Sequence, residues 1–272
     1  TRINEVLDVV PEINDPAQPL PAPAQHGYVQ FEHVTFSYPG AEEPAICDVS
    51  FSARPGETTA IVGGTGSGKS TLVSLIPRFY DVDECRVLVD GVDVRDMAQA
   101  ELRAKIGFVP QRAVLFTGTI AENVRYGKPD ASEAEVQRAA STAQATEFIS
   151  DMPDGFDSAI AQGGINVSGG QKQRLSIARA LVRKPEIYVF DDSFSALDFA
   201  TDARLRAALK SETTGATVLI VSQRVGTIMD ADRIIVLDDG RVAGIGRHRE
   251  LLESCPVYRE IVSSQVTLEE AA

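Results

Sequence analysis

The chain has 272 residues, of which 43% are hydrophobic, so it can bury a large core as one domain with a subdomain or as two domains. Its formal net charge of −13 argues against a nucleic-acid-binding surface, which would need a basic patch. No apolar run approaches the roughly 20 residues that span a bilayer, and no secretory signal opens the chain, so we expect a soluble piece. The three cysteines are unclustered and lack metal-ligand spacing, so we expect them to be reduced cysteines of a cytosolic protein.

Residues 1–27 are predicted to form a semi-extended linker, because five prolines lie there among Ala, Asn and Asp residues. The opening, residues 3–7, could be the end of a helix that comes from a missing domain. The chain starts with Thr1 rather than Met, which favours the interpretation that a preceding segment has been removed.

The next segment combines two predicted antiparallel strands with a phosphate-binding loop. Alternating residues indicate strands over 28–36 and 49–53. Residues 63–70 (GGTGSGKS) fill the pattern G-x-x-x-x-G-K-[ST] at every fixed position, between an apolar strand and an apolar helix start. There the glycines turn backbone N–H groups toward phosphates, Lys69 supplies a cation for the β- and γ-phosphates, and the Ser70 hydroxyl is a ligand for Mg²⁺. We therefore expect a nucleoside triphosphate site made by Gly63, Gly64, Thr65, Gly66, Ser67, Gly68, Lys69, Ser70 and Thr71.

The middle of the chain is predicted to be a helical insertion. After strands at 86–89 and 106–109, the pattern is helical from about residue 118 to residue 185, with helices expected over 120–124, 133–143 and 146–150. A further helix begins at Ser168-Gly169-Gly170-Gln171, and its Ser/Gly-rich start is suited to face an anion. One chain seldom needs two phosphate-facing helix starts for a single nucleotide.

Strands and helices alternate again in the last third of the chain. Strands are predicted over 187–190, 217–221, 233–237 and 242–245, and helices over 201–209 and 249–262. The first of these strands is apolar and ends in Asp191, the Walker B form, in which the carboxylate holds Mg²⁺ through its water shell. The order of elements predicts an α/β fold: a P-loop NTPase (RecA-like) core with an antiparallel β-subdomain and an inserted α-helical subdomain.

The two glycine-rich motifs together resemble those of the nucleotide-binding domain of an ABC transporter, of the exporter type. The likeness covers roughly residues 28–265 and leaves residues 266–272 as a C-terminal tail. It implies that ATP and Mg²⁺ bind at the P-loop, while the signature Ser168-Gly169-Gly170-Gln171 caps the ATP of a second, opposing nucleotide-binding domain in a head-to-tail dimer. It also implies a transmembrane domain before the linker and a place at the cytoplasmic face of the cell membrane.

The resemblance assigns roles to three further residues. Tyr38 follows a predicted strand, and an aromatic ring at this place stacks on adenine in the family. Gln111 resembles the Q-loop glutamine, whose amide oxygen can bind Mg²⁺ or the attacking water. Asp198 ends a stretch similar to the D-loop, which crosses the dimer interface toward the opposite ATP. The implied metal ligands are therefore Ser70, Gln111 and Asp191.

Two positions depart from the family pattern at the catalytic centre. Asp192 stands where hydrolytically competent members carry a Glu that polarises the attacking water, and its carboxylate falls short by on the order of 1 Å. Gln223 stands where the family's switch histidine is expected, and an amide can bind a γ-phosphate but cannot carry charge or relay a proton. Both changes predict one half of a heterodimeric exporter, with slow turnover at its own site and an intact signature for a partner's site.

Three alternatives stay open. The chain could be half of an ordinary homodimeric exporter that tolerates Asp192 and Gln223. It could be an ATP-gated dimerisation clamp with negligible hydrolysis of its own. A soluble ABC protein of translation or DNA repair is disfavoured, because those usually carry tandem cassettes or long coiled-coil inserts, which this acidic single cassette lacks.

Overall fold

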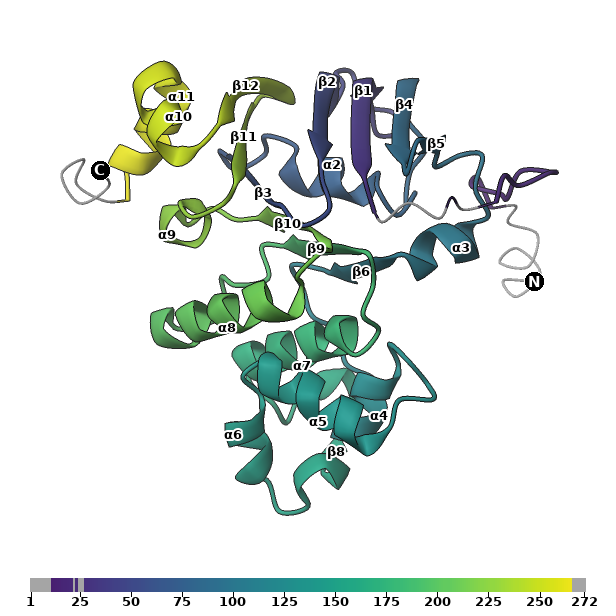
Figure 1. Ribbon diagram of the computed structural model, residues 1–272, viewed down its shortest axis with the longest axis vertical. Helices are drawn as coiled ribbons and strands as arrows, with labels where there is room; N and C mark the ends of the chain where they lie inside the picture. The colour runs from purple at the N-terminus through teal and green to yellow at the C-terminus, as the bar shows by residue number, and fades with distance from the viewer. Residues whose placement is uncertain (1–10, 22, 24–26, 266–272) are drawn as a thin grey trace.

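A six-stranded sheet forms the centre of the molecule (Figure 1). The computed structural model describes residues 11–21, 23 and 27–265. Five strands of the central sheet run parallel, and the sixth, at one edge, is antiparallel to its neighbour. In spatial order the strands are β12 (Arg241–Gly246), β11 (Arg233–Asp238), β3 (Thr58–Gly63), β10 (Thr217–Val221), β9 (Ile187–Asp191) and β6 (Ile106–Val109).

The two faces of this sheet belong to different hydrophobic cores. In β9 and β10, Val189 and Leu219 pack in one core together with Leu72 of helix α2 (Lys69–Ser74). Phe190 packs in the other core together with Leu175 of helix α7 (Gly169–Leu181). Successive side chains of a strand point to opposite faces, and buried parallel strands are apolar on both. Helices α2 and α7 therefore lie on opposite sides of the sheet (Figure 1).

A separate antiparallel sheet covers the α2 side, and it confirms the predicted β-subdomain. Its core includes the stacked rings of Phe31 and Phe51, whose centroids are 4.5 Å apart. The strands, in spatial order, are β2 (Ile46–Ala53), β1 (Val29–Phe36), β4 (Glu84–Val89) and β5 (Val92–Asp93).

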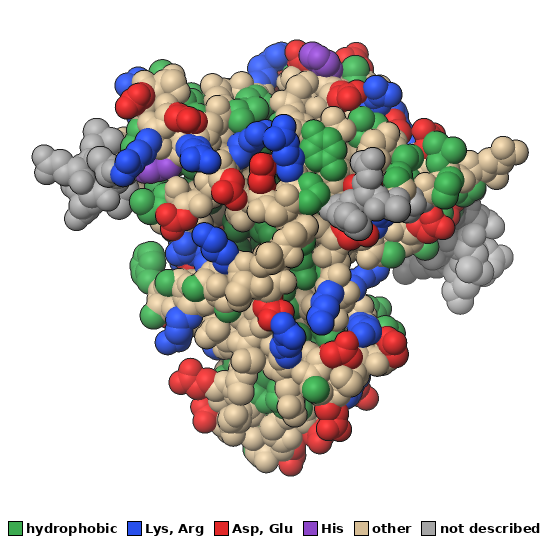
Figure 2. Space-filling view, in the orientation of Figure 1, with side chains coloured by type: hydrophobic (Ala, Val, Ile, Leu, Met, Phe, Trp, Pro, Cys, Tyr) green, Lys and Arg blue, Asp and Glu red, His purple; other side chains and the backbone are tan. Residues whose placement is uncertain are grey.

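The α7 side carries a helical lobe, which confirms the inserted helices. Three of its helices begin with reciprocal capping boxes: Thr119 with Glu122, Ser132 with Glu135, and Ser168 with Gln171. Figure 2 shows acidic side chains gathered at the far end of this lobe, whereas basic and acidic groups are interspersed over the rest of the visible face. The lobe also contains a short β-ribbon that the sequence did not reveal. Its elements are β7 (Gly118–Thr119), α4 (Ile120–Arg125), α5 (Glu133–Thr142), α6 (Thr146–Ser150), η1 (Gly155–Asp157), β8 (Ala159–Ile160), η2 (Gln162–Gly164) and α7.

The C-terminal region corrects one prediction. Instead of one helix over 249–262 there are two, α10 (His248–Ser254) and α11 (Pro256–Ser263). Cys255 between them is extended, with φ −113° and ψ 106°, because the ring of Pro256 disfavours a helical conformation in the preceding residue. The remaining helices are α3 (Gln99–Ala104) and α9 (Val225–Ile228), which were not predicted, and α8 (Phe199–Glu212), which was.

The described part of the predicted linker is hydrogen-bonded to the start of α3 and the residues before it. The Leu20 N–H donates to the Asp96 carbonyl over 2.8 Å, and the Asp15 carboxylate accepts from the backbone N–H of Gln99, at the start of α3, over 3.0 Å. The predicted helix end at 3–7 and the tail 266–272 lie outside the described residues. Within the described residues, no helix combines the length and the apolar composition needed to cross a bilayer.

Candidate functional site

The loop between β3 and α2 has a backbone that requires glycine at two positions. Gly68, just before α2, has φ 93°, and a Cβ there would lie 2.6 Å from the Ala45 carbonyl oxygen. A Cβ on Gly63 would lie 2.2 Å from the Leu237 carbonyl oxygen. The loop is thus pressed between β2 and β11, which fixes where its N–H groups point.

Lys69 is folded back into this loop. Its Nζ donates to the carbonyl oxygens of Gly64 over 2.6 Å and Gly63 over 3.0 Å, and only 7% of the residue is exposed. Burial lowers the pKa of Lys69, which the nearby carboxylates of Asp192 and Asp191 oppose. A phosphate group entering the loop can replace the two neutral carbonyls as partner, because its full negative charge attracts the Lys69 ammonium more strongly than a carbonyl dipole does.

The side chains of Ser70 and Asp191 are in contact at the carboxyl end of the central sheet. The Ser70 hydroxyl donates to Oδ1 of Asp191 over 2.8 Å, which joins the start of α2 to the end of β9. Burial raises the pKa of Asp191, and the bond from Ser70 opposes that rise. A hydroxyl and a single carboxylate are hard oxygen donors that fit Mg²⁺ held chiefly by water and phosphate. These two residues would hold the ion, which neutralises phosphate charge when bound.

Gln111 and Asp192 form the opposite wall of the same site. Nε2 of Gln111 donates to Oδ2 of Asp192 over 3.2 Å, and burial raises the pKa of the Asp192 carboxyl. Asp192 has a left-handed backbone, with φ 44°, directly after the last residue of β9. The carboxyl group predicted to act on water is therefore in contact with the amide predicted to position it.

Tyr38 lies at the rim of the site. Its hydroxyl is 3.0 Å from Oγ1 of Thr71, and its ring packs edge-on against Phe36 and Tyr80. The residue is 38% exposed, so part of the ring is open to a ligand. The pocket that these groups enclose has a volume of about 330 Å³. It is lined by Tyr38, Ala45, Thr65, Gly66, Gly68, Lys69, Ser70, Thr71, Gln111, Asp192, Val221 and Gln223.

The signature residues lie outside this pocket, on the other side of the sheet. Ser168 caps α7: its hydroxyl accepts from the Gln171 N–H over 3.3 Å, and its own N–H donates to Oε1 of Gln171 over 2.8 Å. Gly170 lies against the predicted D-loop, where a Cβ would come 3.1 Å from the Ala196 carbonyl oxygen. Asp198 is exposed and caps α8 through the Thr201 N–H. The structure therefore separates the two phosphate-facing motifs within one chain.

Comparison with known families decides the assignment. The family model described as ABC transporter matches residues 46–195, more than half of the chain. The chain belongs to the ABC transporter family. ABC ATPase domains bind ATP, usually with Mg²⁺.

The relatives of this ABC domain include several exporters. A bacterial Atm1-family ABC exporter with ATP bound superposes with a TM-score of 0.94 at 38% identity, over 98% of this chain and 47% of that one. An ABC transporter ATP-binding protein of Mycobacterium tuberculosis is 50% identical over 97% of this chain and 46% of the relative. An ATP-dependent lipid A-core flippase of Chromobacterium violaceum is 42% identical over 95% and 44%. The chain thus spans about half the length of the relatives it matches.

Sequence reasoning missed some residues of this ABC site. Ala45 and Val221 line the pocket without any motif to mark them. Arg224 donates to the carbonyl oxygens of Ser195 over 2.7 Å and Leu197 over 3.2 Å, and thereby ties the loop after β10 to the D-loop. The sequence feature that could have pointed to Arg224 is its position directly after Gln223.

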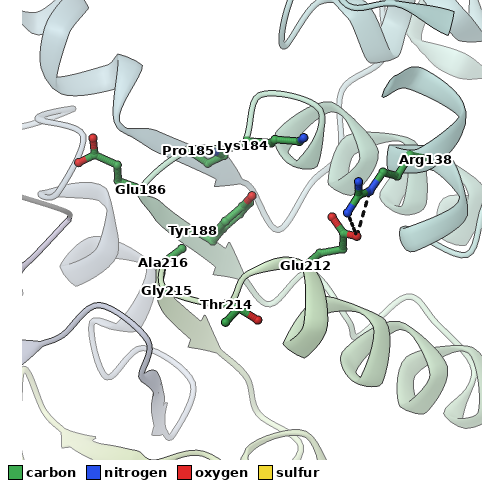
Figure 3. A pocket seen from close by; sticks show the side chains of 9 residues that line it. All are labelled: Arg138, Lys184, Pro185, Glu186, Tyr188, Glu212, Thr214, Gly215 and Ala216. Carbon is green, nitrogen blue, oxygen red and sulfur yellow. Dashed lines mark hydrogen bonds and ion pairs between the residues drawn. The ribbon is translucent and has the colours of Figure 1, made fainter. Parts of the chain in front are cut away.

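A second cavity does not fit the ABC chemistry. It has a volume of about 370 Å³ and lies near the beginnings of β9 and β10, where Tyr188 and Ala216 contribute to its wall (Figure 3). Arg138 and Glu212 form an ion pair of 2.7 Å at its edge. Ligands of parallel α/β sheets bind at the carboxyl ends of the strands, which is where the P-loop pocket lies.

Proposed function

We propose that this chain is the nucleotide-binding domain of an ABC exporter, whose own ATP site is catalytically weak and whose signature completes a competent site on a partner. Residues 28–265 would form the domain, and residues 1–27 would link it to a transmembrane domain. The domain would then work at the cytoplasmic face of a membrane.

The contact between Ser70 and Asp191 carries the nucleotide-binding part of the proposal. It brings together two of the three predicted Mg²⁺ ligands at 2.8 Å, beside a buried Lys69 whose partners are replaceable carbonyls. The name of one relative, a β-(1→2)glucan export ATP-binding/permease protein of Rhodopseudomonas palustris, supports outward transport.

The catalytic weakness rests on Asp192 and Gln223. The Asp192 carboxylate already accepts a bond from Gln111 and is one methylene shorter than the expected Glu. Gln223 lines the pocket but has no group that titrates near neutral pH. A second candidate, an ATP-gated clamp with negligible hydrolysis, is favoured by the same two residues. An ordinary homodimeric exporter would instead have to tolerate Asp192 and Gln223 at both sites.

Nucleotide binding is tested by titrating ATP into Lys69→Ala, with Lys210→Ala as a matched control, because Lys210 is an exposed lysine on α8. We expect Lys69→Ala to lose ATP affinity and Lys210→Ala to keep it. Equal affinity of the two variants would contradict the P-loop assignment.

Division of labour is tested by mixing two variants of this chain. The first carries Asp192→Glu with Gln223→His, which restores the family's catalytic pair, together with Ser168→Arg, so that two copies of it cannot complete each other's site. The second carries Lys69→Ala and retains the signature. We expect the mixture to hydrolyse ATP, and adding Ser168→Arg to the second variant to abolish that activity. Persistent hydrolysis would show that the signature does not complete the opposite site. Brisk hydrolysis by the unmodified chain would instead contradict the weak site, and no restored activity would favour the clamp.

A further inference from the structure

The side chain of Gln265, at the end of the described chain, is hydrogen-bonded to the loop after β10. Its Nε2 donates to the carbonyl oxygen of Gln223 over 2.6 Å, and its Oε1 accepts from the N–H of Val225 over 2.9 Å. The two bonds flank Arg224 on both sides. One amide, about forty residues later in the chain, thus holds the backbone of the loop that contributes Gln223 to the ATP pocket.

The loop needs this support because of how α9 begins. Helix α9 has only four residues, and its N-cap residue, Arg224, makes no side-chain capping bond. The first N–H groups of a helix have no partner within the helix, so they need an acceptor from elsewhere. Oε1 of Gln265 is that acceptor for Val225. Gln265 therefore does for α9 what a neighbouring Ser or Asp does for other helices.

Gln265 lies just after a well-packed helix, α11, whose Tyr258 and Val262 are fully buried in a core that also contains Val225 and Ile228 of α9. The Tyr258 hydroxyl is 2.7 Å from Nδ1 of His248, which ties α11 to α10. Helix α9, which is short and lacks a side-chain cap, thus packs against the well-buried α11, and Gln265 adds two hydrogen bonds, one to the start of α9 and one to the loop before it.

The loop position matters to two groups at the site. The side chain of Gln223 lines the P-loop pocket, and the guanidinium of Arg224 donates to the D-loop carbonyls of Ser195 and Leu197. Moving the backbone at residues 223–225 would shift both groups together. The contacts form a continuous chain from α11, through Gln265 and the loop, to the pocket wall and the D-loop.

We propose that Gln265 is a positioning residue for ATP hydrolysis: it fixes the loop that presents Gln223 to the nucleotide and Arg224 to the D-loop. The inference rests on the proposed function only in taking the P-loop pocket as the ATP site. Because Gln265 acts through the loop and touches neither the adenine side of the pocket nor the P-loop, it should affect turnover rather than affinity.

The experiment compares Gln265→Ala with Ser264→Ala in the full chain. Ser264 is the matched control, because its hydroxyl donates to the Ile261 carbonyl of α11 and, within the described part of the chain, forms no hydrogen bond with the loop. Hydrogen exchange should show the Val225 amide opening roughly tenfold faster in Gln265→Ala, since it loses its acceptor, and unchanged in Ser264→Ala.

Turnover is measured with the same two substitutions in the Asp192→Glu, Gln223→His background, where the Gln223→His change keeps the carbonyl that Gln265 binds. We expect Gln265→Ala to lower kcat roughly fivefold, with KM for ATP and the melting temperature unchanged. A raised KM with unchanged kcat, an equal loss in Ser264→Ala, or unchanged exchange at Val225 would each overturn the proposal. If the background does not hydrolyse ATP, the proposed function is in error at that site, and the exchange result alone decides the role of Gln265.

Discussion

Asp192→Glu is the substitution that examines the catalytic centre most directly. The added methylene extends the side chain by about 1.3 Å, given a carbon–carbon bond of about 1.5 Å. Displacements of about 1 Å from productive geometry cost roughly a hundredfold in rate. We therefore expect up to a hundredfold faster turnover, which corresponds to about 2.7 kcal/mol of the barrier.

The same substitution has a cost in stability that the structure also explains. Asp192 has φ 44°, a left-handed conformation that Asp tolerates better than Glu. We expect Glu to lower the free energy of unfolding by about 1 kcal/mol and the melting temperature by about 2 °C. Faster ATP turnover together with a lower melting temperature would show that the Glu side chain takes the backbone conformation of Asp192 and reaches further into the site.

The assay is phosphate release at saturating ATP, at protein concentrations where the dimer forms. Asp192→Asn is the control, because it keeps the shorter length and removes the base, and it should lower turnover further. If Asp192→Glu turns over within twofold of the unmodified chain while binding ATP equally well, carboxylate reach does not limit this site.

Three further predictions concern binding and stability. Tyr38→Ala should weaken ATP by about 1 kcal/mol through lost stacking, and an equal loss for inorganic triphosphate would show that Tyr38 does not contact the base. Gly68→Ala should abolish nucleotide binding and lower the melting temperature, because its Cβ would come 2.6 Å from the Ala45 carbonyl oxygen. Gly64→Ala should change the melting temperature and nucleotide binding much less, because no atom lies within 4 Å of its Cβ. Asp90→Ala should cost about 3 kcal/mol in urea unfolding, since it removes a buried ion pair with Lys105 and leaves the N–H groups of Gly27 and Tyr28 without their acceptor, although Lys105 keeps Glu186 at 2.6 Å. Glu32→Ala, which breaks the exposed pair with Arg86, should cost less than about 1 kcal/mol.

Much of the fold could be predicted because strands and long helices leave a periodic pattern. The buried strand Ile187–Asp191 and the capped helix beginning at Ser168 were identified with nearly their observed bounds. Short elements such as α9 and the two-residue strands were missed, since four residues or fewer do not establish a period. The break before Pro256 was missed although Pro restricts the residue before it, because apolar spacing continued across it.

The candidate site was predictable where chemistry is local in sequence and not where it depends on folding. The P-loop residues lie together in one loop, and their roles remain predictions that this geometry supports. By contrast, the bond between Gln111 and Asp192 joins residues 81 positions apart, and the amide of Gln265 reaches a loop about forty positions earlier. No periodicity or motif encodes such pairings, because the sheet order brings them together.

Neighbouring residues of one central strand pack into different cores, which gives a practical way to observe each lobe separately. The methyl groups of Val189 and Leu219 point into the P-loop side, and those of Ile220 point into the helical side, although Leu219 and Ile220 are neighbours in one strand. Methyl-labelled samples would therefore place reporters of both lobes only a few ångströms apart in the chain. When nucleotide is added to such a sample, the methyl resonances on one side of the sheet should change first. The order in which those on the other side change would show how the effect of nucleotide binding reaches the opposite face.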